Sequence, residues 1–345
     1  MYKKYQKHFS HILSITKPKI LLLVLFLYQS KLFPSGPYSV ETISEQDGLR
    51  NGPDYSEALL YFSSEAPTPL PVIVLIPGFT NSISAIQNWG SYLASYGYAT
   101  FLVNVNSFFL PPFFRSEALL DAMTTIKVEN ERLSSPLFGM LNIEDFTVGG
   151  YSMGGGGALI SATQDTSIKA VIALAAWLDN SSITLDNSTP TLFISGEFDN
   201  VAPNNIHTDI FYNNTPESTD KLLYEISDGF HSTVTSPYND QEMGLKTLFW
   251  IEKYILNNFS NCESLVTQPP TASTFLTNLD CTIENIGDIT QDGITNVLDL
   301  ILLISWIING VDPSDQEMDI ANITNDSALD IFDIIMLADV ISTRI

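Results

Sequence analysis

One pentapeptide of the sequence has the residue types that make a serine reactive. It reads Gly150-Tyr-Ser-Met-Gly154, and three more glycines follow it. It lies between an apolar, strand-like segment that ends at Val148 and a helix-like segment that begins at Ala158. Small residues between a strand and a helix let the chain turn sharply, so that the serine hydroxyl projects from the end of the strand. The pattern indicates that Ser152 is a nucleophile. The alternative is a glycine-rich turn with a solvated serine.

A nucleophilic serine needs a base to accept its proton and an acid to orient that base. On such a turn, the acid and then the histidine follow the serine along the chain. His231 lies in a loop after an apolar run, whereas His207 falls in what resembles a surface helix. Asp199 follows a strand-like run closely, and Asp179 is the alternative acid. We therefore predict His231 as the base and Asp199 as its partner.

Acyl transfer also needs donors for the oxyanion of its intermediate. The amide of Met153 follows the nucleophile at a helix N-terminus, where it faces the developing charge. A second amide is expected from the loop after an early strand. Pro77-Gly-Phe-Thr80 occupies that place, so the backbone N–H of Phe79 is the second predicted donor.

The elements that must position these residues alternate along the chain. Continuous apolar, β-branched runs are typical of strands buried on both faces, and strands that alternate with helices indicate βαβ units. Strands are expected at 72–76, 100–105, 146–150, 171–175 and 191–195, and helices at 86–96 and 245–256. The predicted fold class is therefore α/β, with a doubly wound, mostly parallel sheet.

The charge balance excludes some classes of partner. The 345 residues contain 15 Lys and Arg against 39 Asp and Glu, a formal net charge of −24. Six of the lysines fall within the first 31 residues, which hold no acid, so the rest of the chain has nine basic residues against 39 acidic ones. Such a polyanion repels phosphate backbones, which excludes nucleic-acid binding and disfavours anionic substrates.

The N-terminal segment indicates export. A nine-residue apolar run at 20–28 comes directly after Lys17-Pro-Lys19 and is too short to span a membrane. Residues 1–31 therefore resemble a secretory signal, and an uncleaved anchor is the alternative. Cys262 and Cys281 are separated by 19 residues, and in an oxidising compartment such a pair is expected to form a disulfide. The alternative is two unpaired thiols. We expect a secreted protein.

An acidic repeat follows Cys281. Residues 288–299 place oxygen-bearing side chains at loop positions 1, 3, 5, 9 and 12, with a glycine at position 6, which matches a Ca²⁺-binding loop of the EF-hand type. The predicted ligands of this loop are Asp288, Thr290, Asp292, Ile294, Asn296 and Asp299. Those of a second loop, 34 residues later, are Asn322, Thr324, Asp326, Ala328, Asp330 and Asp333.

The second loop is expected to bind Ca²⁺ more weakly. Asn322 replaces the aspartate of the first position, and Ser327 replaces the glycine. Each loop precedes an apolar helix, expected at 300–308 and 334–340. A solvated acidic tail, the alternative interpretation, would lack such apolar helices. The two loop–helix units, at 285–343, resemble a type I dockerin, and this resemblance implies docking onto a cohesin.

Several motifs in the preceding part, at 34–281, resemble bacterial cutinases and, more narrowly, polyester hydrolases that cleave poly(ethylene terephthalate). They are Ile76-Pro-Gly-Phe-Thr80, the segments 89–97, 104–107, 152–157 and 196–203, Ala176-Trp177, and the two cysteines. The resemblance implies an α/β-hydrolase fold without a lid, a shallow exposed cleft, and ester hydrolysis without a metal in the chemistry. We expect no cofactor for catalysis and a monomeric catalytic domain.

The resemblance also implies roles for single residues. Phe79 and Met153 would be the oxyanion donors, and Trp177 would form an aromatic wall beside the scissile ester, although a core aromatic is the alternative. Tyr151, Val201, Ser232 and the Phe79 side chain would line the cleft. Phe79 stands where the family usually has tyrosine, and Tyr151 where it has histidine or tryptophan. These two departures leave the preferred substrate open.

The sequence thus predicts three segments: a signal at 1–31, an α/β-hydrolase domain at 32–281, and a small all-α, calcium-binding, dockerin-like domain at 282–345. The expected function is a secreted serine esterase of the cutinase or polyester hydrolase type. One alternative is a general lipase or esterase for small or acyl-chain esters. Another is a non-catalytic binding protein with a hydrolase-like fold.

Overall fold

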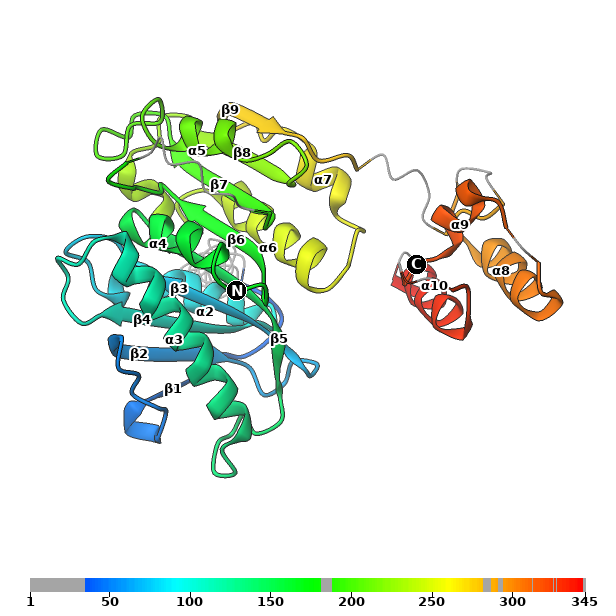
Figure 1. Ribbon diagram of the computed structural model, residues 1–345, viewed down its shortest axis with the longest axis horizontal. Coiled ribbons are helices and arrows are strands. Elements are labelled where there is room, and N and C mark those ends of the chain that lie inside the picture. The colour runs from blue at the N-terminus through cyan, green and yellow to red at the C-terminus, as the bar shows by residue number, and fades with distance from the viewer. Residues whose placement is uncertain are drawn as a thin grey trace, which may run out of the picture.

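A nine-stranded sheet forms the frame of the larger part of the chain (Figure 1). The computed structural model describes residues 35–180, 188–281, 287–290, 294–311, 313–324, 326 and 328–343. The strands are β1 (Glu41–Ser44), β2 (Tyr55–Phe62), β3 (Leu70–Ile76), β4 (Ala99–Val105), β5 (Leu141–Tyr151), β6 (Ile168–Leu174), β7 (Thr191–Gly196), β8 (Lys221–Ile226) and β9 (Ala272–Thr277).

The order of the strands in the sheet is β1-β2-β4-β3-β5-β6-β7-β8-β9. The six central strands, β3 to β8, are parallel, and antiparallel pairs lie at both edges. The carboxyl ends of the parallel strands therefore share one edge of the sheet, with β5 near its middle. In open α/β sheets this edge is where ligands bind.

Helices cover both faces of the sheet. One core packs side chains of α3 (Pro112–Glu131), α4 (Met153–Ala162) and α5 (Thr208–Asn214) against one face. The other packs α2 (Gln87–Ser95), α6 (Gln241–Ile255) and α7 (Cys262–Val266) against the opposite face. Alternate residues of β3 illustrate the division, since Val72 and Val74 face the first core and Ile73 and Leu75 the second. The structure confirms the doubly wound, mostly parallel α/β fold.

The predicted elements differ from the observed ones mainly at the edges. Every strand expected in the interior is present, with boundaries that shift by a few residues. The edge strands β1 and β9, the strand β2 next to β1, and the 20-residue helix α3 are not among the expected elements. β9 falls in the threonine- and serine-rich stretch between the cysteines and pairs with β8 along one side only.

Three helices at the C-terminal end form a cluster of their own (Figure 1). They are α8 (Val297–Asn309), α9 (Asp315–Ala321) and α10 (Ile331–Thr343). Their small core consists of Ile289, Leu303, Ala321 and Leu337, with further apolar residues packed around it. α8 and α10 extend over the two helices expected from the sequence, and α9 is an addition.

The expected export signal at 1–31 lies outside the described residues. None of the helices in the described ranges has both the length and the apolar character needed to cross a membrane.

Candidate active site

Ser152 lies at the sharp turn between β5 and α4. Its backbone has a positive φ of 57°, a strained conformation for a residue with a side chain. The turn is possible because its neighbours are small. A Cβ atom on Gly154 would lie 2.2 Å from the carbonyl oxygen of Ile76. The Ser152 amide donates to Leu174 O at 2.8 Å, which fixes the turn against the end of β6.

The three predicted triad residues come together at the carboxyl edge of the sheet. His231 Nε2 lies 3.0 Å from Ser152 Oγ, and His231 Nδ1 lies 2.7 Å from Asp199 Oδ2. The other carboxylate oxygen of Asp199 accepts the amides of Val201 and Ala202 at 2.9 and 2.8 Å. These two hydrogen bonds fix the orientation of the Asp199 carboxylate. The geometry suits a base whose second nitrogen is held by a buried acid.

The loops that carry the acid and the base support each other. Asp199 follows β7, and His231 begins the 3₁₀ turn His231–Thr235 after β8. Phe198 N donates to Gly229 O at 2.7 Å, which joins the two loops. From the far side, the buried indole of Trp89 donates to Val234 O at 2.9 Å. Trp89, expected in a helix and in a family-like segment, also helps to hold the turn that begins with His231.

The two predicted oxyanion donors follow two neighbouring strands, Phe79 after β3 and Met153 after β5. Met153 is the first residue of α4, so no carbonyl within the helix is available to its amide. Phe79 follows β3, and within the described chain its amide donates to no carbonyl. A Cβ atom on Gly78 would lie 2.8 Å from Ser152 Cβ, which shows how closely this loop approaches the nucleophile.

Arg115 braces the loop that holds Phe79. This fully buried guanidinium donates to Pro77 O at 2.8 Å and to Phe108 O at 3.2 Å. Thr80 N donates to the same Phe108 carbonyl at 3.1 Å. Burial lowers the pKa of Arg115 to about 10, so the group is still charged at neutral pH. The sequence alone gave no signal for this residue, because its partners are backbone carbonyls that only the fold brings near.

The expected cleft residues surround the triad. The Tyr151 ring is buried 4.9 Å from the His231 imidazole, and burial raises the pKa of Tyr151. Trp177 is half-buried, and its amide donates to Ser152 O at 2.9 Å. The side chains of Phe79, Val201 and Ser232 are exposed around them. The surroundings of the hydroxyl are therefore mostly apolar and open to solvent.

The alternative base and acid occupy other positions. The sequence predicts His207 on a surface helix, and this prediction is wrong. His207 precedes α5 and is only 6% exposed. Its ring lies 5.8 Å from the Trp177 ring and 6.0 Å from the Phe211 ring, and burial lowers its pKa. Asp179 is exposed in the loop after β6. His207 thus packs beside Trp177 in the interior, and Asp179 is exposed to solvent.

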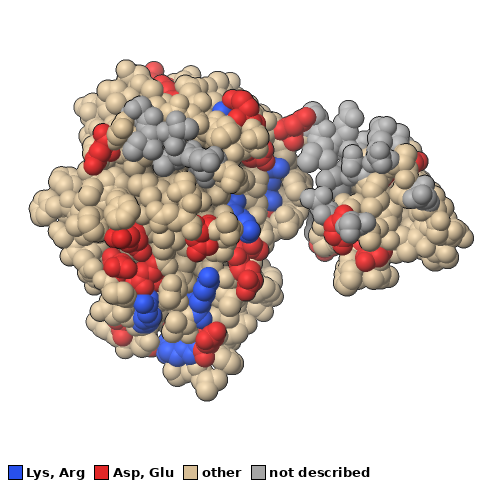
Figure 2. Space-filling model, viewed as in Figure 1, with Lys and Arg blue, Asp and Glu red and all other residues tan. Residues whose placement is uncertain are grey.

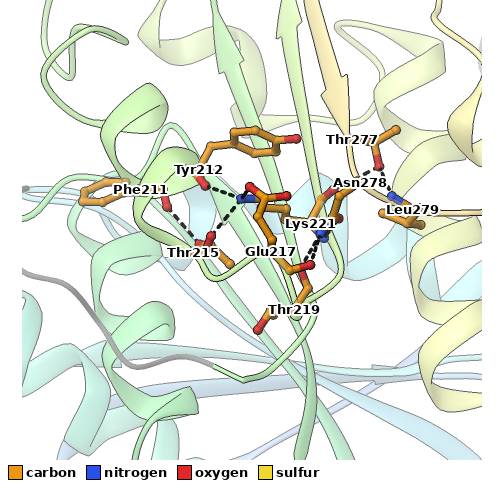
Figure 3. Close-up of polar contacts among 9 residues, drawn as sticks. All are labelled: Phe211, Tyr212, Thr215, Glu217, Thr219, Lys221, Thr277, Asn278 and Leu279. Atoms are coloured by element: carbon orange, nitrogen blue, oxygen red, sulfur yellow. Dashed lines mark hydrogen bonds and ion pairs between the residues drawn. The ribbon is translucent and has the colours of Figure 1, made fainter.

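A buried lysine fixes the helix that follows His207 (Figure 3). Lys221, the first residue of β8, donates to Tyr212 O at 3.3 Å and to Thr215 O at 2.8 Å, at the C-terminal end of α5. Its third contact is Glu217 Oε1 at 2.7 Å. A cation stabilises the unpaired carbonyls at a helix C-terminus. The lysine therefore anchors α5, and with it His207, to the sheet.

The two cysteines form a disulfide near the end of this domain. Cys262 begins α7, and Cys281 follows β9, with a Cα–Cα distance of 5.5 Å. The C-terminal end of α7 is held by the buried Lys246, which donates to Leu265 O at 3.1 Å and to Thr267 O at 2.6 Å. The disulfide and this lysine together tie the last strand of the sheet to α6.

The first acidic loop brings several of its predicted ligands together. Thr290 Oγ1 lies 2.8 Å from Asp299 Oδ1 and 3.3 Å from Asp288 Oδ1, so positions 1, 3 and 12 meet. Both aspartates are fully buried. Asn296 caps α8 by accepting from Leu298 N, and its side chain donates to the carbonyl of Ile294. Asp292 lies outside the described residues.

The second loop repeats this arrangement. Thr324 Oγ1 lies 2.9 Å from Asp333 Oδ1 and 3.2 Å from Asn322 Oδ1. Asp330 accepts the amide of Phe332, as Asn296 accepts that of Leu298 in the first loop. Asp326 and Ala328 lie between them, and Asp326 Oδ1 accepts the amide of Ala328.

Oxygen donors and buried carboxylates in both loops fit a hard cation such as Ca²⁺. Asp299 and Asp333 are fully buried, and no lysine, arginine or histidine of the described residues forms an ion pair with either of them. Across the described ranges, no three His, Cys, Asp or Glu side chains converge as a metal cluster, although Asp292, the third acid of the first loop, is not among those residues.

Comparison with known proteins places the larger domain in a family. The profile of the PET hydrolase-like family matches residues 30–282. Cutinase est1 of Thermobifida alba is 31% identical over 222 residues, which cover 64% of this chain and 72% of the cutinase. The bis(hydroxyethyl) terephthalate hydrolase of Streptomyces coelicolor is 30% identical over 222 residues, 64% of this chain and 68% of the relative. Lipase 1 of a Moraxella species is 28% identical over 226 residues, 65% of this chain and 67% of the lipase. The chain therefore belongs to the PET hydrolase-like family and is a carboxylic ester hydrolase.

Proposed function

We propose that this protein is a secreted serine esterase of the cutinase or polyester hydrolase type, and that Ser152, His231 and Asp199 are its catalytic residues. The observation that carries the proposal is the continuous hydrogen-bonded arrangement of these three side chains at 3.0 and 2.7 Å. The strained turn at Ser152 and the membership of the PET hydrolase-like family support it.

The reaction follows from these positions. Ser152 Oγ attacks the ester carbonyl carbon while His231 Nε2 takes its proton, and Asp199 stabilises the imidazolium that forms. The carbonyl oxygen becomes an oxyanion, which accepts hydrogen bonds from the amides of Phe79 and Met153. His231 then gives its proton to the leaving alcohol, and an acyl-enzyme remains. Water activated by His231 hydrolyses this intermediate, which regenerates the free serine.

The surroundings of the triad favour neutral, apolar esters. Phe79, Phe198, Val201 and Phe230 expose 44–59% of their surfaces beside the reacting groups. The excess of acidic residues over the chain disfavours an anionic substrate. Relatives that are named for cutinase activity and for terephthalate ester hydrolysis fit the same preference. We infer that the substrate is a polyester with apolar units.

The C-terminal helices are proposed to be a calcium-ordered docking module. Ca²⁺ would be held by Asp288, Thr290 and Asp299 with Asp292 in the first loop, and by Asn322, Thr324 and Asp333 in the second. The ion would neutralise buried carboxylates and so stabilise the small core between α8 and α10. Apolar side chains at equivalent places in both units, such as Leu298 and Phe332 at 55% and 61% exposure, suit a protein partner of the cohesin type.

Labelling with a fluorophosphonate probe tests the catalytic proposal directly. The wild-type chain should react at one serine and hydrolyse p-nitrophenyl butyrate. Ser152→Ala should lose both properties, and His231→Ala should lower kcat by a similar factor, on the order of 10⁴ or more, because triad residues act as a unit. Probe labelling that survives Ser152→Ala would assign the nucleophile to another residue.

A further inference from the structure

Four phenylalanines are exposed in the short stretch that leads from the end of β4 into the first turn of α3. Residues 106–114, here called the phenylalanine loop, contain no charged residue. Phe108, Phe109, Phe113 and Phe114 expose 42%, 71%, 52% and 42% of their surfaces. Large apolar side chains that gather on a surface are typical of a binding site, since their contact with water is unfavourable. The triad mechanism uses none of the four.

The phenylalanine loop is continuous with the active site. The Phe109 ring packs edge-on against the Phe79 ring at 5.6 Å, and the amide of Phe79 is a proposed oxyanion donor. The carbonyl of Phe108 accepts hydrogen bonds from Thr80 N and from the buried Arg115. The same guanidinium also holds the Pro77 carbonyl. A ligand or surface that binds the phenylalanine loop would therefore lie next to the oxyanion loop and Ser152.

The loop is also held in one shape before anything binds. Leu110 N donates to Ser107 O at 3.0 Å, which closes a turn around Phe108 and Phe109. Pro111 and Pro112 restrict the backbone, and Phe113 and Phe114 lie in the first turn of α3 with their rings 5.7 Å apart. Six peptide steps separate the first and last phenylalanine, so their Cα atoms lie within roughly 23 Å of each other. Such preorganisation lowers the entropy cost of binding.

The charge of the chain selects among possible occupants. The net charge of −24 repels anionic surfaces, and Figure 2 shows acidic side chains scattered among larger uncharged areas. An uncharged solid meets no such barrier. We propose that the phenylalanine loop is the surface through which this enzyme adsorbs to a water-insoluble, uncharged polyester. This proposal rests on the proposed esterase function and adds a contact outside the cleft that holds the scissile ester.

The test separates adsorption from chemistry. Adsorption of the full chain to amorphous poly(ethylene terephthalate) film is measured in the Ser152→Ala background, where no film is consumed. Phe113→Ser/Phe114→Ser should lower the partition coefficient of the protein between film and solution roughly tenfold, because two aromatic rings no longer contribute apolar contact with the film. In the active enzyme, this pair of changes should lower film hydrolysis at low enzyme concentration. The kcat/KM for p-nitrophenyl butyrate should stay within twofold of wild type.

A matched control is available near the amino-terminal end of β5, away from the carboxyl ends of the strands where Ser152 lies. Leu133→Ser/Phe138→Ser removes side chains that are 84% and 50% exposed, just before the start of β5, and should leave adsorption unchanged. If the first double variant does not fold, as judged by circular dichroism, Phe113→Ser alone replaces it.

Several results would overturn the proposal. One is equal adsorption by wild type and the Phe113/Phe114 variant, and another is an equal loss in the control variant. Loop-dependent binding to phosphatidylcholine vesicles but not to film would show a lipid surface instead. A dimer that dissociates in the loop variant, seen by sedimentation, would show a second copy of the chain. Failure of the wild type to hydrolyse p-nitrophenyl butyrate would refute the proposed function alone, since adsorption is measured without turnover.

Discussion

The neutral, buried His207 makes the stability of this protein depend on pH. Its ring packs between Trp177 and Phe211, and its Nδ1 atom is buried without a hydrogen-bond partner among the described residues. Burial lowers its pKa; the nearby Asp199 opposes this effect, and His231 adds to it. His207→Phe keeps an aromatic ring of similar size and removes the titration.

The sign and size of the effect follow from linkage. In the unfolded chain a histidine titrates near pH 6.5, about its ordinary pKa. Below that pH the unfolded chain binds a proton that the folded protein does not, so the free energy of unfolding falls as the pH falls. One such group contributes at most about 1.4 kcal/mol per pH unit until the lower, folded-state pKa is reached. Relative to wild type, His207→Phe should therefore gain stability below pH 6.5 and keep a constant difference above pH 7.5.

Urea unfolding of both proteins between pH 7.5 and 4.5 measures this difference. Tryptophan fluorescence is a suitable signal, because Trp89, Trp177 and Trp250 all lie in the catalytic domain and Trp177 touches the substituted ring. A stability difference that does not change with pH, or that favours wild type in acid, would refute the argument that His207 is buried in its neutral form. Turnover of a soluble ester should fall far less than in His231→Ala. A comparable loss would make His207 the base.

Three further changes test other features of the structure. Lys221→Met should destabilise the fold by about 2–4 kcal/mol, because it leaves the carbonyls at the end of α5 unpaired; Glu217→Gln, which alters the exposed partner, should cost less than about 1 kcal/mol in the same urea titration. Dithiothreitol should lower the melting temperature, since a disulfide that closes a loop of this length stabilises by about 3 kcal/mol, while the rate on a soluble ester at 25 °C stays constant; an unchanged melting curve would contradict this role. Chelation by EDTA should reduce the helical circular dichroism of the C-terminal module without affecting esterase activity, and Asp288→Ala should weaken Ca²⁺ binding, measured by calorimetry, more than Asn322→Ala. Loss of turnover on chelation would indicate a metal in the catalytic domain.

The interior strands were predictable because a strand that is buried on both faces has a continuous run of apolar residues. The parallel strands are continuous apolar runs, and their order places the serine, acid and histidine loops at one edge. The edge strands β1 and β9 have no continuous apolar run, because most of their residues are exposed or half-buried. In β2 the run is interrupted by the exposed Ser56 and Glu57. α3 was missed for a different reason. Its buried side includes polar residues such as Asp121 and Glu129, which pair with Arg50 at 2.7 Å and Arg132 at 2.5 Å, so its apolar periodicity is weak.

The candidate site divides in a similar way. The chemistry of Ser152 and His231 depends on side chains whose types and order are visible in the sequence. The residues that hold the site in place depend on contacts between distant segments. Arg115 bonds to carbonyls, and His207 was assigned to the surface because the residues around it are polar. Neither contact has a local pattern from which it could be predicted.

The disulfide determines how the catalytic domain bears mechanical load. Suppose that the C-terminal module is held fast while the enzyme is dragged along a solid. The pull then enters the larger domain at Cys281. β9 lies inside the loop that the disulfide closes. It is an edge strand, so a force along the chain could break its hydrogen bonds to β8 one after another. Because Cys281 is bonded to Cys262, the tension bypasses β9 and passes into α7, which Lys246 fastens to α6. The disulfide therefore protects the edge strand β9 from any force that is applied through the residues after Cys281.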